Sequence, residues 1–218
     1  MIRIQRINLG VARSILLGCV AVLLVFLALW LLNSSRLGTS PPQRFNGQVL
    51  ESPEFAAGWP ATAQVQDHEG RFRQLADFRG KVVLLFFGYT QCPDVCPTAL
   101  QRASEVFRQL GHQAESVQVL FMTLDPERDT LPLLSAYVPA FDTRFLGLRP
   151  STESVPELAR DFRVFYQINP GKTPESYTLD HGINTYVYDP KGRLRLSIGH
   201  DASAEAVAED VLRLLEKP

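Results

Sequence analysis

Cysteine is scarce in this chain of 218 residues, which contains only Cys19, Cys92 and Cys96. A structural zinc site takes four ligands, and this chain has no second cysteine pair to complete such a set. A four-cysteine zinc site is therefore excluded. Any thiol chemistry must centre on Cys92 and Cys96.

Repeats and blocks of like charge are also absent. The net charge is −1, so the composition gives no reason to expect a nucleic-acid partner. The 15 prolines and 14 glycines are scattered, which excludes a collagen-like or low-complexity chain. A hydrophobic fraction of 45% with 21% charged residues is typical of a globular protein.

The N-terminal segment contains a long uncharged run. Residues 15–32 are nearly all apolar, and as a helix they would extend roughly 27 Å, close to the thickness of the bilayer core. Three arginines precede the run and one follows it, so the positive-inside rule predicts that residues 1–14 are cytoplasmic. We therefore expect residues 15–32 to be a single-pass transmembrane helix, with the rest of the chain on the outer side.

Two other interpretations of this run are weaker. A cleaved signal peptide has a shorter apolar core and a cleavage site of small residues, whereas this run ends in bulky residues at 28–32. The segment 16–19 is faintly similar to a lipoprotein processing box, but the apolar run continues well past Cys19. We expect an uncleaved anchor in which Cys19 faces lipid.

Beyond the anchor, we expect a linker at 33–48 and one folded domain at 49–218. The linker lacks periodicity and contains Asn, Ser, Gly and Pro. In the domain, apolar runs rich in β-formers alternate with segments of helical periodicity, which predicts a mixed α/β sheet covered by helices. The expected strands are 81–88, 117–124, 185–188 and 194–198, with a hairpin at 63–73; the expected helices are 97–110, 130–138, 151–165 and 204–215.

Cys92 and Cys96 lie where the buried strand 81–88 meets the helix 97–110. Ligand sites of α/β sheets gather at such strand ends. Residues four apart face each other in a helical turn, so the two sulfur atoms can form a disulfide or bind one metal ion. The partial positive charge of the helix N-terminus would stabilise a thiolate at Cys96.

Three interpretations of the pair stay open: a metal-binding pair, a redox-active pair and a structural disulfide. A disulfide would close a very small loop and stabilise the fold little, and two thiolates suit Cu(I), which prefers soft ligands. A third ligand would most plausibly be histidine. We expect His68, His112 and His200 to be solvated or at element ends. His181, in a short loop before a strand, is the candidate that only the fold can test.

Three motifs resemble the SCO/SenC family, thioredoxin-fold copper chaperones for the assembly of cytochrome c oxidase. Phe87–Pro97 resembles the family signature, and Thr123–Thr130 resembles its second motif. Asp180-His181, followed by a strand and the turn Asp189–Gly192, resembles the third. The resemblance extends from about residue 60 to the C-terminus and implies a thioredoxin-like fold.

By this resemblance Cys92, Cys96 and His181 are the copper ligands, for Cu(I), Cu(II) or both. The chain departs from the pattern at Gln91, where many relatives carry His. This departure removes no ligand, but it bears on the local electrostatics or on partner contact.

Four charged residues lie near these motifs. We expect Asp94 and Asp125 to serve in loop hydrogen bonding and surface charge rather than at the metal. We expect Arg128 and Asp129 to form an ion pair and to cap the following helix.

The resemblance implies a metallochaperone rather than an enzyme, delivering copper to the copper A centre of cytochrome c oxidase subunit II. A copper donor and a thioredoxin-like reductant would be further partners, because an oxidising compartment would lock Cys92 to Cys96. The alternative is a thiol–disulfide oxidoreductase that maintains the cysteines of the oxidase copper site, although CxxC spacing is usual there. A peroxiredoxin-type peroxidase shares the fold but lacks the sequence context of its nucleophile.

The expected location follows from the leader. It is short and basic and has no long Ser/Arg-rich presequence, which favours a bacterial inner membrane with the C-terminal domain in the periplasm.

Overall fold

The computed structural model describes residue 18, residues 20–28, residue 30 and residues 45–50, 59–173 and 176–216. The chain divides into two units, Met1–Arg44 and Phe45–Pro218. In the first unit residues 20–28 are helical, and most of the remainder, including part of the predicted anchor 15–32 and the predicted linker up to Arg44, lies outside the described residues. Within the part that is described, no helix is both long enough and apolar enough to cross a membrane.

The second unit is built on a seven-stranded sheet with the strand order β1-β9-β8-β3-β4-β5-β2. The neighbouring strands β3, β4 and β5 run parallel, and every other pairing in the sheet is antiparallel. The strands are β1 (Gln48–Val49), β2 (Gln66–Asp67), β3 (Val82–Gly88), β4 (Val117–Thr123), β5 (Leu146–Arg149), β8 (Thr185–Tyr188) and β9 (Leu194–Ile198).

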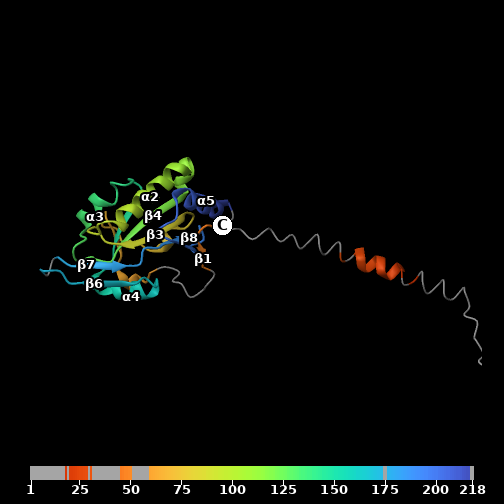
Figure 1. Ribbon diagram of the computed structural model, residues 1–218, viewed down its shortest axis with the longest axis horizontal. Helices are drawn as coiled ribbons and strands as arrows, with labels where there is room; N and C mark the ends of the chain where they lie inside the picture. The colour runs from red at the N-terminus through yellow and green to blue at the C-terminus, as the bar shows by residue number, and fades with distance from the viewer. Residues whose placement is uncertain are drawn as a thin grey trace, which may run out of the picture. The chain divides into compact units, whose positions relative to one another are not determined.

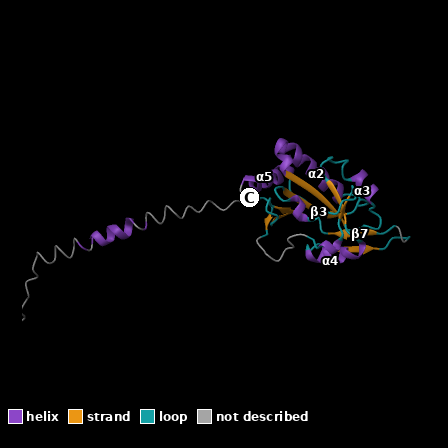
Figure 2. Cartoon of the chain, turned by 180° about the vertical axis from the view of Figure 1, so that it is seen from behind, coloured by secondary structure: helices purple, strands orange, loops and turns teal. Residues whose placement is uncertain are grey.

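Helices cover both faces of this sheet (Figures 1 and 2). The long helices α2 (Val95–Leu110) and α5 (Ala204–Glu216) lie on one face, with α3 (Leu131–Tyr137) beside α2, and α4 (Val155–Asp161) lies on the other. Short 3-10 helices complete the fold: η1 (Ala61–Ala63), η2 (Leu75–Phe78), η3 (Gly111–Ser116) and η4 (Thr152–Ser154).

The burial of β3 on both faces explains its sequence. All seven of its residues are buried. Phe86 lines a small apolar cavity with residues of α2 and α5, while Phe87 packs its ring 5.1 Å from that of Phe162 at the end of α4. A strand packed between two layers must be apolar along its whole length, so the continuous run predicted its central position correctly.

A separate two-stranded sheet pairs β6 (Tyr166–Asn169) with β7 (Thr178–His181). It lies near α4 in Figure 1. Among the described residues, neither strand pairs with the main sheet. The position of β7 relative to the domain therefore depends on side-chain contacts.

The prediction of a helix over 151–165 was wrong in its length. The segment forms η4 and α4 and ends at Asp161, and Arg163 then adopts a positive φ of 52°. This left-handed residue turns the chain out of the helix and into β6. The other predicted helices and strands are confirmed to within a few residues, whereas β1, β5, β6 and β7 were not predicted.

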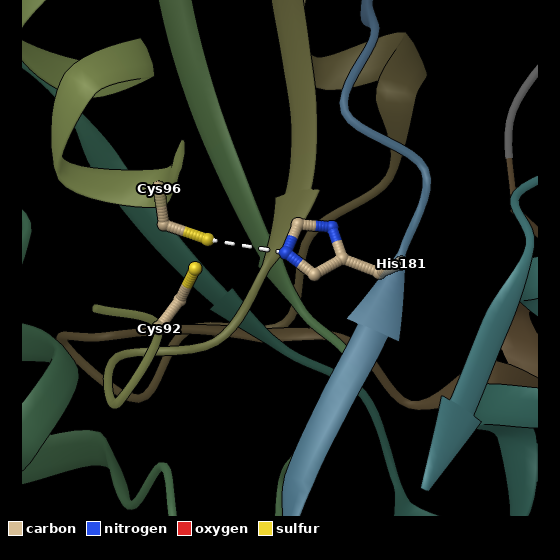
Figure 3. A group of neighbouring side chains, drawn as sticks. All are labelled: Cys92, Cys96 and His181. Atoms are coloured by element: carbon tan, nitrogen blue, oxygen red, sulfur yellow. Dashed lines mark hydrogen bonds between the residues drawn. The ribbon is translucent and has the colours of Figure 1, made fainter. Parts of the chain in front are cut away.

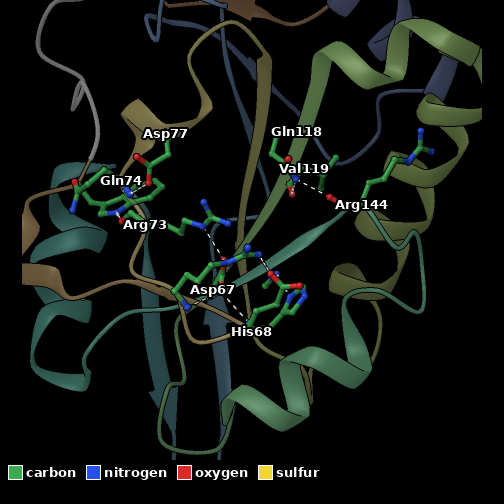
Figure 4. Close-up of polar contacts among 12 residues, drawn as sticks. Asp67, His68, Arg73, Gln74, Asp77, Gln118, Val119 and Arg144 are labelled. Carbon is green, nitrogen blue, oxygen red and sulfur yellow. Dashed lines mark hydrogen bonds and ion pairs between the residues drawn. The ribbon is translucent and has the colours of Figure 1, made fainter.

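A buried aspartate organises the turn after β2 through hydrogen bonds and ion pairs. Asp67, fully buried, accepts hydrogen bonds from the backbone N–H groups of Glu69 and Arg71 and binds the guanidinium of Arg73 at 2.8 Å (Figure 4). Its neighbour His68 accepts a hydrogen bond from the N–H of Gly147 in β5 at 3.0 Å. His68 therefore links the turn after β2 to β5, and it is half-buried, so the expectation that it is solvated holds only in part.

Candidate metal centre

Cys92, Cys96 and His181 meet at one end of the main sheet (Figure 3). Cys92 lies in the loop after β3, Cys96 is the second residue of α2, and His181 is the last residue of β7. Sγ of Cys96 lies 3.4 Å from Nε2 of His181, and one ligand atom of each residue lies within 4.8 Å of the others. Among the described residues this is the one cluster of histidine, cysteine and acidic side chains close enough to hold a metal ion.

The location of His181 differs from the prediction. The residue ends a strand rather than lying in a loop before one. β7 has four residues and alternates exposed and buried positions, a signal too short to distinguish from a loop in the sequence. The fold supplies what the sequence could not, because His181 lies 85 residues from Cys96 in the chain and is still in contact with it.

Gly88 makes room for Cys96. It is the last residue of β3, and a Cβ atom at this position would lie 2.6 Å from Sγ of Cys96 and 3.0 Å from the ring of Phe121. Only glycine allows the first turn of α2 to lie this close to the strand end. In the sequence, the glycine between Phe87 and Tyr89 at the end of the strand was the sign of this close approach.

The imidazole of His181 has a defined orientation. Its Nδ1 lies 2.8 Å from the carbonyl oxygen of Gly182, which can only accept, so Nδ1 carries the proton. The lone pair of Nε2 is left facing the sulfur atoms, as a metal ligand requires. The rings of Phe86 and Tyr89 meet the imidazole edge-on, with centroids 6.1 and 5.9 Å away, and restrict its rotation.

The two thiols have very different proton affinities. A hydrogen bond with Cys96 lowers the pKa of Cys92 to about 4, although burial acts in the opposite direction; a hydrogen bond with His181 and the backbone N–H groups of Cys96 and Asp94 add to the lowering. The hydrogen bond with Cys92 and burial together raise the pKa of Cys96 far above its ordinary value. The pair therefore holds one negative charge on Cys92, and both cysteines are free rather than joined as a disulfide.

A buried carboxylate fixes the loop that leads to Cys92. Asp129, fully buried, accepts hydrogen bonds from the N–H and hydroxyl of Thr90 and from the hydroxyl of Thr123. Burial raises its pKa. The predicted ion pair between Arg128 and Asp129 was wrong, because Arg128 pairs with Asp125 instead. The predicted helix cap was also wrong, since Thr130 caps α3.

Asp125 and Asp94 have the loop and surface roles that were expected. Asp125 is buried, binds Arg128 and accepts a hydrogen bond from the hydroxyl of Tyr177 at 2.6 Å. Asp94 is exposed at the N-cap of α2, and its carboxylate lies 3.5 Å from the hydroxyl of Thr98. Neither belongs to the cluster of possible metal ligands.

The site opens into a shallow groove of about 430 Å³. Cys92 and His181 line it, together with the apolar side chains of Pro93, Val95 and Ile183. Cys96 does not line the groove and is fully buried, whereas 8% of Cys92 is exposed. A molecule that enters the groove therefore meets Cys92 and His181 first.

The two remaining histidines lie outside this cluster of ligand atoms. His112 is exposed in η3. His200 precedes α5, and its carbonyl oxygen accepts a hydrogen bond from Arg102. The exposure of His112 and the position of His200 before α5 agree with the expected surroundings of the two side chains.

The fold and the site together define a thioredoxin-like α/β protein with two cysteines and one histidine arranged as a candidate metal centre. A family model described as SCO1/SenC matches residues 61–216. The chain belongs to the SCO1/SenC family, and the resemblance drawn from its three motifs is confirmed.

Individual relatives agree with this assignment. The chain is 43% identical over 168 residues to the mitochondrial SCO2 homolog of Bos taurus, an alignment that covers 76% of this chain and 63% of that protein. The structure of Bradyrhizobium japonicum ScoI with copper bound is 36% identical, with a TM-score of 0.67, and covers 73% of this chain and 100% of that one. Apo Sco1 from Thermus thermophilus is 38% identical, with a TM-score of 0.66, and covers 81% of this chain and 100% of that one.

Proposed function

We propose that this chain is a metallochaperone that binds copper through Cys92, Cys96 and His181 and delivers it during the assembly of cytochrome c oxidase. The convergence of two sulfur atoms and one imidazole nitrogen within 4.8 Å carries the proposal. Thiolates and imidazole are ligands that copper accepts in both of its oxidation states. The copper-bound ScoI of Bradyrhizobium japonicum supports this choice of metal.

The asymmetry of the site suits the release of a metal ion as well as its binding. Cys92 is a thiolate before any metal arrives, so binding displaces one proton fewer than it would from two thiols. Cys92 and His181 border the groove while Cys96 lies behind them. A ligand of the acceptor would replace Cys92 and His181 first, and Cys96 would be the last residue to release the metal ion.

The acceptor that we propose is the copper A centre of oxidase subunit II. A copper donor and a thioredoxin-like reductant that keeps Cys92 and Cys96 reduced complete the set of partners. We place the domain on the periplasmic side of a bacterial inner membrane, on the strength of the basic leader and the apolar run at 15–32.

The alternative is a thiol–disulfide oxidoreductase that keeps the cysteines of the oxidase copper site reduced. The low pKa of Cys92, about 4, favours it, because a thiolate attacks disulfides. Cys92 would form a mixed disulfide with the partner, and Cys96 would displace the partner's reduced thiol and leave Cys92–Cys96 oxidised. This chemistry does not require His181.

Anaerobic titration of the reduced full-length protein with Cu(I) separates the two functions. We expect one tightly bound copper ion per chain, lost in Cys96→Ser and weakened in His181→Ala. Cys19→Ser and His200→Ala are the matched controls and should bind copper like the wild type. Absence of tight binding, together with rapid disulfide exchange that His181→Ala leaves unchanged, would instead establish the oxidoreductase.

A further inference from the structure

Arg128 contacts both chain segments that carry ligands of the candidate metal centre: the loop that leads to Cys92 and the segment that leads to His181. It lies between β4 and α3 with only 13% of its side chain exposed. Its Nη1 donates to the carbonyl oxygen of Tyr177 at 2.8 Å and lies 3.4 Å from Oε1 of Gln91. Gln91 directly precedes Cys92, and Tyr177 directly precedes β7, which ends at His181.

The hold on Tyr177 has several parts. The guanidinium of Arg128 stacks 3.5 Å from the centroid of the Tyr177 ring, while its Nε binds the carboxylate of Asp125. The hydroxyl of Tyr177 donates to the same carboxylate at 2.6 Å. Stacking, a backbone hydrogen bond and a shared carboxylate thus hold one tyrosine, and a planar guanidinium is suited to such a combination.

The β6–β7 hairpin depends on these contacts between Arg128 and Tyr177, because among the described residues no hydrogen bonds to the main sheet position it. In the described part of the chain β7 pairs with β6 and with no strand of the seven-stranded sheet. The N–H of Leu179 lies 3.4 Å from the hydroxyl of Tyr89, which is a long contact. From Tyr177 to His181 the extended chain covers roughly 13 Å. If Tyr177 at the start of β7 could move, the imidazole of His181 at the end of the strand would be displaced.

We propose that Arg128 is a positioning residue that keeps the imidazole of His181 next to the two cysteines. It does so because Tyr177 and Gln91 both bind to its guanidinium. The inference rests on the proposed copper function for its metal readout, but the placement of the hairpin can be tested without metal. It also gives Gln91 a role: its side-chain oxygen accepts from the guanidinium, whereas a protonated histidine at that position could only repel it.

The test replaces Arg128 with lysine, which keeps the charge but cannot bind three partners and stack at once. Arg73→Lys is the matched control, because Arg73 also pairs with a buried aspartate, at 2.8 Å, and lies over an aromatic ring, at 5.9 Å, away from the site. Tyr177→Leu removes the stacking surface from the hairpin side and leaves the Arg128–Asp125 pair in place. It is the second variant if Arg128→Lys fails to fold.

Two readouts are made on the full-length protein. The first is the electron paramagnetic resonance spectrum of the Cu(II) complex, with its affinity; we expect the imidazole nitrogen coupling to weaken or vanish and the Cu(II) affinity to fall about 10- to 100-fold. Binding of Cu(I), held mainly by the sulfur atoms, should change less. The second is amide hydrogen exchange of the reduced metal-free protein, which we expect to be faster in β7 and unchanged in β3.

The outcomes separate this inference from the proposed function. Wild-type imidazole coupling and affinity in both Arg128→Lys and Tyr177→Leu, with β7 exchange unchanged, would overturn the role of Arg128 while leaving copper binding intact. If the wild type binds no copper, the proposed function fails, and exchange alone decides: faster exchange in β7 supports the positioning role, and unchanged exchange refutes it. A similar effect from Arg73→Lys would show general destabilisation and would also refute it.

Discussion

The absence of one side chain decides how Cys96 is placed. Gly88 ends β3 at the point where α2 begins to cross it, and the space that a Cβ would fill is occupied by Sγ of Cys96 and the ring of Phe121. Both neighbours are buried, with exposed fractions of 0%, so neither can move aside freely. The geometry of the site thus depends on a residue that has no functional group.

We predict that Gly88→Ala destabilises the fold by about 1–3 kcal/mol, because the added methyl group overpacks a buried strand end. It should also weaken copper binding by displacing Cys96. Urea denaturation and Cu(I) titration measure the two effects. Gly182→Ala is the control within the same site, since its Cβ would find its nearest neighbour at an ordinary 3.6 Å. Equal behaviour of the two variants would contradict the steric argument.

At the scale of elements, the turn after β2 is organised by one carboxylate. Burial alone would raise the pKa of Asp67, but hydrogen bonds from the backbone of Arg71 and from the guanidinium groups of Arg73 and Arg71 outweigh it and lower the pKa. A carboxyl group with a lowered folded-state pKa stabilises the fold above its unfolded-state pKa. That stabilisation is lost as the pH falls through the folded-state value.

We predict that Asp67→Asn lowers the free energy of unfolding by about 1–3 kcal/mol at pH 7, because the amide cannot satisfy both arginines. The difference from the wild type should shrink below about pH 4, where the wild-type carboxylate also takes up a proton. Urea denaturation across this pH range measures it. Asp161→Asn, which removes a partly exposed acid 3.5 Å from Arg160, should change stability by less than about 1 kcal/mol at either pH. A pH-independent deficit in Asp67→Asn would argue against the charge as its source.

At the scale of the whole molecule, the first residues of the second unit, 45–50, contribute to its fold. Asp210 in α5 is fully buried and accepts hydrogen bonds from the N–H groups of Asn46 and Gly47, at 2.9 and 2.8 Å, and from Arg213. β1 adds an edge strand that pairs with β9. Residues 46–49 are therefore bound to both a helix and the main sheet.

We predict that residues 45–218 fold by themselves and that residues 51–218 are less stable by about 1–3 kcal/mol, since the shorter chain leaves the buried carboxylate of Asp210 without its donors from Asn46 and Gly47. Chemical denaturation of the two chains measures the difference. Asp210→Asn within 45–218 should reproduce part of the loss. Equal stability of the two chains would mean that the anchoring at Asp210 contributes nothing.

The sequence alone determined the parts of this protein that local chemistry controls. The apolar run 81–88 required a strand buried on both faces, and the apolar faces of 97–110 and 204–215 required helices packed against a sheet. The spacing of Cys92 and Cys96 before a helix indicated a paired-thiol site. Together with the two later motifs it was enough to indicate the family.

Tertiary structure decided everything that depends on segments distant in the chain. Whether His181 meets Cys96 across 85 residues and whether His68 binds the backbone of β5 depend on which chain segments lie side by side. Short strands such as β6 and β7 are stabilised by the partners they pair with rather than by their own composition. A sequence lists the side chains in order, but only packing determines which of them share a site.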